Sequence, residues 1–141
     1  MFQHIITQKA MKTLKTALSV SIFSLVLTSC ATMQRTDLYF GTNIPTGGNV
    51  TQRQWKEFCD GVITHYFPEG YTEVDAVGKW MDTQTKQTIS ENTKVVTFLG
   101  KPTKKRNAFL DSITQKYIRQ FHQQSVLRID SKPKVKFISK T

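Results

Sequence analysis

Four side chains that lie far apart in the sequence combine chemical types that suit ligand binding: Tyr39, Trp80, Arg128 and Asp130. A guanidinium beside an aromatic ring suits an anionic or a sugar ligand, because the cation pairs with charge and the ring packs against a flat face. We interpret these four as the candidate ligand or interface residues. Asp75 is a further candidate for the same surface.

Strand parity is the reason for grouping these residues. If Leu38 and Leu127 face the core, then their neighbours Tyr39 and Arg128 face the opposite way, and so does the second residue beyond Arg128. Trp80 fits either face, because a glycine two residues before it can mark a bulge.

Two other interpretations compete with a ligand site. Arg128 could pair with Asp130 or Asp37 and close one end of a sheet. Alternatively, the surface could be the interface of a homodimer.

No residue set in the sequence identifies a reaction. His65 and His122 lack the spacing of metal ligands, and there is no Cys-x-x-Cys pair. Cys59 lies beside Phe58 in a helical pattern, which is typical of a small core residue rather than a nucleophile. The sequence therefore predicts no catalytic residue, no metal and no cofactor.

Residues 1–29 have the layout of a secretory signal. Lys12 and Lys15 supply positive charge, and residues 17–27 are apolar apart from three serines. The next feature is Leu27-Thr28-Ser29-Cys30, which resembles the bacterial lipoprotein box. In that box the cysteine becomes the lipidated first residue. The resemblance implies that Cys30 is acylated and that residues 30–34 form a lipidated tether.

The apolar run is too short to remain as a membrane-spanning helix, which needs about 20 residues. Several acyl chains anchor a protein stably where one does not, and processed lipoproteins carry three. Ala31 rather than aspartate follows the cysteine, which favours the outer membrane, facing the periplasm. We expect a lipid-anchored envelope protein whose translation starts at Met1 or Met11.

The chain is strongly basic. Its net charge is +10, and the first 29 residues hold three of the 20 basic residues and none of the 10 acidic ones, so the remainder carries +7. Lys104, Lys105 and Arg106 stand together at an expected helix start, where positive charge is unfavourable. The cluster is either a solvated basic face or a contact for anionic envelope polymers or lipid headgroups. Behind a secretion signal, nucleic acid is not an expected partner.

Hydrophobic periodicity after the tether predicts four strands, at residues 36–40, 71–81, 93–99 and 125–130. It also predicts two helices, at residues 51–66 and about 103–122. The polar residues 82–92 would be a loose hairpin connection, and residues 135–139 would be extended.

The order β-α-β-β-α-β is that of the ferredoxin-like split βαβ fold. We therefore expect a single α+β domain at residues 35–141, with a four-stranded antiparallel sheet and both helices on one face. A different α+β sandwich, or a domain whose core a partner completes, remains an alternative.

Three sequence blocks resemble an uncharacterised bacterial family of small secreted proteins and lipoproteins. They are RTDLYFG at residues 35–41, FPEGYT and GKW at residues 67–72 and 78–80, and SVLRID at residues 125–130. The resemblance covers residues 35–138. The family is catalogued as a domain of unknown function, so it implies a domain boundary and an envelope location but no activity.

Three functions fit these observations. The first is a non-catalytic binding or structural module tethered to a membrane by acylated Cys30. The second is a small dimeric enzyme, similar to ferredoxin-like oxygenases and isomerases, with a pocket on the open sheet face. The third is electrostatic docking of the basic residues onto anionic envelope components.

Overall fold

The computed structural model describes residues 32–140, so the predicted signal segment and Cys30 lie outside the described residues. The chain runs through β1 (Gln34–Gly41), α2 (Gln52–Phe58), η1 (Cys59–Ile63), α3 (Thr64–Tyr66), β2 (Thr72–Met81), β3 (Thr88–Gly100), α4 (Lys104–Gln120) and β4 (Leu127–Ser131). Within this range, no helix combines the length and the apolar character that crossing a bilayer requires.

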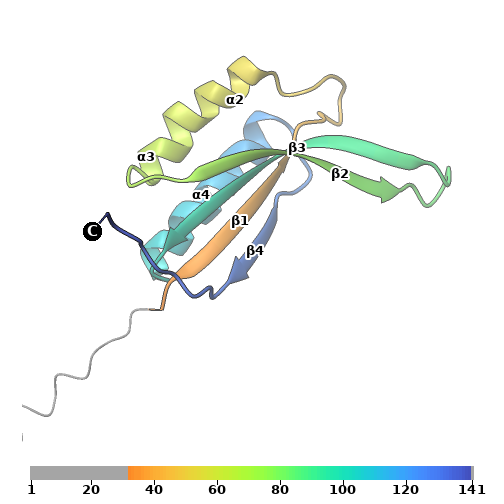
Figure 1. The fold of residues 1–141 in the computed structure, drawn as a ribbon. Coiled ribbons are helices and arrows are strands. Elements are labelled where there is room, and N and C mark those ends of the chain that lie inside the picture. The colour runs from red at the N-terminus through yellow and green to blue at the C-terminus, as the bar shows by residue number, and fades with distance from the viewer. Residues whose placement is uncertain (1–31, 141) are drawn as a thin grey trace, which may run out of the picture. The chain divides into compact units, whose positions relative to one another are not determined.

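The four strands form one sheet in the order β2-β3-β1-β4, and each strand is antiparallel to its neighbours. β3 therefore lies between β1 and β2, which is the split βαβ arrangement. The helical layer covers one face of the sheet (Figure 1). The expected ferredoxin-like α+β fold is confirmed.

The core lies between the helices and one face of the sheet. Leu38 and Phe40 of β1 are completely buried, as is Tyr117 of α4. The Phe40 ring centroid is 4.7 Å from that of Tyr117 and 5.4 Å from that of Trp55. Burying each such side chain contributes roughly 1.5–3 kcal/mol. Because the even-numbered residues of β1 pack here, its odd-numbered residues face away from the helices.

The first helical segment begins at a capping box and contains one irregular turn. The Gln54 amide donates to Thr51 Oγ1 at 3.3 Å, and the Thr51 amide donates to Gln54 Oε1 at 2.9 Å. Residues 59–63 are π-helical, which helical periodicity does not predict. Both Cys59 and Ile63 in this turn are buried.

The β2–β3 hairpin is longer and better ordered than expected. β3 begins at Thr88, and its pairing with β2 runs without interruption from Met81 to Thr72. The turn is held by Asp82 Oδ1, which accepts the amides of Gln84 and Thr85 at 2.8 and 2.9 Å. The predicted loose connection at residues 82–92 was wrong, because backbone pairing rather than side-chain burial extends these strands. Residues 135–139 do not join the sheet.

Candidate binding site on the open sheet face

The face of the sheet opposite the helices carries the first candidate residue. Tyr39 of β1 faces away from the core and lies between Val95 of β3 and Leu127 of β4 in the strand register. Leu127 is 56% exposed. This face therefore presents apolar side chains that the described residues leave uncovered.

Trp80 lies on the same face as Tyr39. The register passes from Gly78 opposite Glu91 to Trp80 opposite Ile89 with no bulge, so the choice of face that parity left open is resolved. The Trp80 side chain is 48% exposed. Two of the four candidate residues therefore share the open face.

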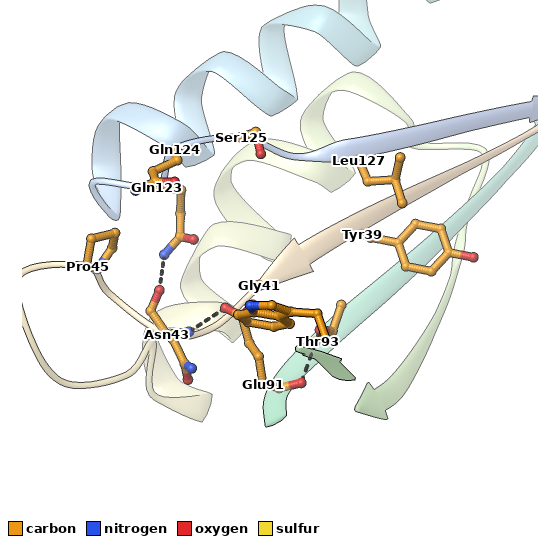
Figure 2. A pocket seen from close by; sticks show the side chains of 11 residues that line it. Tyr39, Gly41, Asn43, Pro45, Glu91, Thr93, Gln123, Gln124, Ser125 and Leu127 are labelled. Atoms are coloured by element: carbon orange, nitrogen blue, oxygen red, sulfur yellow. Dashed lines mark hydrogen bonds between the residues drawn. The ribbon is translucent and has the colours of Figure 1, made fainter. Parts of the chain in front are cut away.

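Both aromatic side chains and two loops line a hollow of about 450 Å³. Figure 2 shows Tyr39 and the loop side chains of this lining. The lining combines aromatic, amide and hydroxyl side chains with one carboxylate. The lining residues are Tyr39, Gly41, Asn43, Pro45, Trp80, Glu91, Thr93, Gln123, Gln124, Ser125 and Leu127.

Hydrogen bonds hold the two loops that form one side of this hollow. Gln123 Nε2 donates to the Asn43 carbonyl at 2.8 Å, which ties the loop after α4 to the loop after β1 (Figure 2). The Asn43 amide donates to Glu91 Oε1 at 3.1 Å. The Tyr117 hydroxyl donates to the Gly41 carbonyl at 2.9 Å and so connects the hollow to the core.

Gly41 makes room for the carboxylate of the hollow. A Cβ atom at Gly41 would lie 2.4 Å from Glu91 Oε1, which is closer than real contacts allow. The glycine therefore permits Glu91 to lie against β1 and accept the Asn43 amide. Glu91 is the single charged residue of the lining, so the hollow contains no cation.

Arg128 and Asp130 lie on the opposite face of the sheet. Arg128 Nη2 donates to Asn107 Oδ1 of α4 at 2.6 Å, and Arg128 Nε lies 2.9 Å from Asp130 Oδ2. Thr36, which is buried beneath the helices, donates its hydroxyl to Asp130 Oδ1 at 2.6 Å. The prediction that this pair shares a surface with Tyr39 was wrong.

The error has a physical cause. Alternation shows which residues of a strand share a face, but not which face is covered. β4 is an edge strand, and on its helix-facing side Asn107 and Asp111 of α4 accept hydrogen bonds from the Arg128 guanidinium. Its apolar residues Leu127 and Ile129 face the open side and remain 56% and 44% exposed.

The ionisation of Asp130 reflects these partners. Burial raises the pKa of its carboxyl, but the hydrogen bond from Thr36 and the nearby Arg128 guanidinium outweigh burial. The pKa of Asp130 is therefore below its usual range. The interpretation in which Arg128 pairs with Asp130 and closes the sheet edge is the one that this geometry matches.

Asp75 is also absent from the open face. It forms an ion pair with Lys94, whose side chain points toward the helices and also donates to Gln52 Oε1 at 3.1 Å. Lys94 is only 9% exposed. Asp75 therefore serves to pair a nearly buried lysine.

Cys59 lies in the core, as expected. It is 6% exposed, and its Sγ lies 3.6 Å from Glu73 Oε2. Burial, followed by the charge of Glu73, raises the pKa of the thiol to about 12. The thiol is therefore protonated at neutral pH, which does not suit a nucleophile.

Sequence patterns missed the polar half of the hollow. Asn43 belongs to a loop rich in glycine and proline, and Gln123 follows the end of α4. Glu91 fell in the segment expected to be a loose connection. No periodic signal marks such residues, because tertiary contacts alone bring them together.

The architecture and the hollow define a ferredoxin-like α+β domain with a candidate binding site on the face opposite its helices. The chain belongs to the family described as protein of unknown function (DUF3574), which matches residues 35–137. No protein with a curated description matches the sequence.

Two structures of a phage SAM lyase share the fold at low sequence identity. A phage SAM lyase in complex with S-methyl-5'-thioadenosine has a TM-score of 0.55 and 13% identity, over 77% of this chain and 87% of that chain. The same lyase in its apo state gives 0.54 and 13%, over 77% and 86%. CutA from Synechococcus elongatus has a TM-score of 0.45 and 9% identity, over 73% and 78%.

Proposed function

We propose that this protein is an envelope lipoprotein that acts as a non-catalytic binding module, tethered to a membrane by acylated Cys30. The tether is supported by the signal layout and by the segment at residues 27–30 that resembles a lipoprotein box. The binding role is supported by the hollow on the open sheet face. Its volume of about 450 Å³ falls within the range of small-molecule sites, about 300–1,000 Å³.

The ligand that suits this hollow is a neutral saccharide. The observation that carries this proposal is the grouping of two aromatic side chains, Tyr39 and Trp80, with three side-chain amides and no cation. Aromatic faces pack against the apolar faces of sugar rings, while amides donate to and accept from hydroxyl groups. The sequence suggested two ligand classes, anionic and sugar. Because Arg128 lies on the other face of the sheet, the hollow has no cation for an anionic ligand, which favours a sugar.

The same lining supports binding rather than cleavage. Most glycoside hydrolases use a pair of carboxylates on either side of the scissile bond. Glu91 is the single carboxylate in this hollow, and its Oε1 is engaged by the Asn43 amide.

Isothermal titration calorimetry on the full chain in detergent micelles tests the proposal. Tri-N-acetylglucosamine serves as the neutral probe and trigalacturonate as the acidic one. We expect the neutral probe to bind and Trp80→Ala to weaken it about tenfold, which corresponds to ~1.4 kcal/mol. Val77→Ala is the matched control, because Val77 is 58% exposed on the same strand but on its other face.

The result would contradict the proposal if neither saccharide bound, if only the acidic one bound, or if both variants lost affinity equally. If neither saccharide binds, the ligand is not a saccharide of this kind. If only the acidic one binds, the ligand is anionic rather than neutral. If both variants lose affinity equally, the saccharide does not bind in this hollow.

A second candidate function is a dimeric enzyme with its pocket between two sheets. It is favoured by exposed apolar side chains on the open face, among them Val74, Leu127 and Ile129 at 56%, 56% and 44% exposure. A second copy would cover such a patch. Sedimentation of the full chain in micelles distinguishes the two: a dimer that Leu127→Lys dissociates supports this candidate, and a monomer excludes it.

A further inference from the structure

We propose that a second site, at the N-terminal end of α4, binds the phosphate group of a phospholipid headgroup. The site lies on the helical side of the sheet, away from the open-face hollow. It depends on neither the saccharide proposal nor the acylation of Cys30.

The site is a hollow of about 520 Å³ between the start of α4 and the segment that follows α3. Lys101, Lys105 and Arg106 line it on the α4 side, and Glu69 lies on the other side. Three cations therefore face one carboxylate. Phe109 adds an aromatic wall, with the Lys105 ammonium 5.4 Å from its ring centroid.

The buried guanidinium of Arg106 is the central observation. Arg106 is 8% exposed, and its Nη1 donates to Thr36 Oγ1 at 3.1 Å. Its Nη2 has no hydrogen-bond partner among the described residues. A buried donor without an acceptor costs about 1–3 kcal/mol, and more when it is charged. Arg106 lines the adjoining hollow, and an anion there would supply the missing acceptor once the side chain turns the buried Nη2 toward it.

The backbone leaves room for this arginine. A Cβ atom at Gly100 would lie 3.1 Å from Arg106 Nε, so glycine lets the guanidinium lie against the strand end. The guanidinium carbon is also 5.9 Å from the Phe67 ring centroid. Arg106 is thus held between β3 and the segment after α3, at the inner side of the hollow.

The helix end supplies further donors. Thr103 caps α4, and its hydroxyl accepts the Arg106 amide at 3.1 Å. The first amides of an α-helix, here those of Lys104 and Lys105, have no acceptor within the helix. Together with the helix dipole they favour an anion at this end, and phosphate is a common occupant of such positions.

The charge distribution lacks an internal explanation. Lysines at a helix N-terminus oppose the dipole. Among residues 32–140, none of the ion pairs includes Lys101, Lys104 or Lys105. A phosphate group would neutralise this cluster, and the Phe109 ring suits the apolar part of a phospholipid. A free phosphate monoester offers the same anionic chemistry without that apolar part.

The test is a titration of the full chain in detergent micelles, followed by NMR of the Lys104, Lys105 and Arg106 amides. The three probes are inorganic phosphate, glycerol 3-phosphate and dihexanoyl phosphatidylglycerol below its own micelle concentration. We expect all three to shift these amides, with the lipid binding at least tenfold more tightly than inorganic phosphate. Equal affinity for all three would assign the site to free phosphate and overturn the lipid assignment.

Two paired variants separate a specific site from general charge. Lys101→Gln with Lys105→Gln is expected to weaken lipid binding at least tenfold, and both positions are exposed, so folding is preserved. Lys132→Gln with Lys134→Gln makes the same change in net charge elsewhere and is expected to leave binding unchanged. Equal losses in the two pairs, or no amide shift with any probe, would overturn the proposal. Trp80→Ala is expected to leave phosphate binding intact, so this test and the saccharide test fail separately.

Discussion

The two hollows of this domain differ in almost every respect that determines a ligand. The open-face hollow is lined by aromatic and amide side chains with the single charge of Glu91. The hollow at the start of α4 is lined by three cations and one carboxylate, and contains a buried guanidinium donor without a partner. The difference shows that one small domain can form a nearly uncharged hollow on one side of its sheet and a cationic hollow on the other side.

A common core positions both hollows. Tyr117 fills the core with its ring and donates its hydroxyl to the Gly41 carbonyl at the open-face hollow. Thr36 accepts from Arg106 Nη1, next to the other hollow. Changes in the core therefore affect both sites, whereas changes at either surface affect one.

The largest expected effect is the loss of the anchor. Cys30→Ala should remove the protein from the membrane fraction and leave the precursor uncleaved by the lipoprotein signal peptidase. Membrane fractionation and the electrophoretic size of the chain measure both. A variant that is processed normally and remains in the membrane after a high-salt wash would contradict acylation. Retention that salt removes would instead indicate electrostatic binding by the basic hollow.

A core substitution should abolish both sites together. Phe40→Ala removes a completely buried ring that contacts Trp55, Phe58 and Tyr117, with an expected loss of about 3–5 kcal/mol. Urea unfolding measures it. Leu127→Ala, on the neighbouring strand and 56% exposed, is the control and should change stability by less than about 0.5 kcal/mol. A similar loss in both variants would show that the open face is packed in solution.

A smaller change should distinguish the two hollows. Gly41→Ala places a methyl group 2.4 Å from Glu91 Oε1, so the carboxylate must move, at an expected cost of about 1–3 kcal/mol. Saccharide affinity should fall while phosphate affinity is retained. Gly78→Ala is the control, because its nearest contact would be an ordinary 3.5 Å to Thr93 Oγ1.

Two outcomes would count against this account of Gly41. One is a loss of phosphate affinity equal to that of saccharide affinity. The other is a failure of Glu91→Ser, which shortens the clashing side chain, to restore stability to Gly41→Ala.

The smallest expected effect is the pH dependence of stability that comes from the Arg128–Asp130 ion pair of β4. The folded pKa of Asp130 is lowered: burial raises it, but the Thr36 hydrogen bond and Arg128 outweigh burial. A lowered folded pKa adds stability that is fully present above the unfolded value, about 3.9, and is lost as the pH falls through the folded pKa. Relative to Asp130→Asn, the wild-type chain should be more stable at pH 7 by at most about 1 kcal/mol, because the pair is partly exposed.

Urea unfolding of both chains at pH 7 and pH 3 measures this difference. It should shrink at pH 3. A difference of the same size at both pH values would show that Asp130 contributes through something other than its charge.

Sequence patterns predicted the elements that pack against the core. Trp55, Phe58 and Ile63 repeat at helical spacing, and Leu38 and Phe40 alternate along β1, because each element must bury one side. The same logic failed where burial ends. In the outer half of the β2–β3 hairpin and in the edge strand β4, few side chains are buried, so their sequence has no clear hydrophobic alternation.

The candidate site residues show the same difference between buried strands and exposed ones. Tyr39 was placed correctly, because its strand neighbours are buried core residues. Arg128 and Asp130 were placed on the wrong face, because polar residues of α4 satisfy them and local alternation contains no information about that helix.

By itself, the sequence determined the order of the elements, and thereby the ferredoxin-like class, because hydrophobic periodicity is a local consequence of burial. It also determined the overall positive charge, and it predicts a secretory signal that ends before Cys30. Only the tertiary structure decided which side chains meet: Tyr39 with Trp80 and the two loops, Arg128 with α4, and Arg106 with Thr36. Apart from the loop directly after β1, the partners lie about 20 to 85 positions apart in the chain, and such pairings depend on the packing of the whole domain.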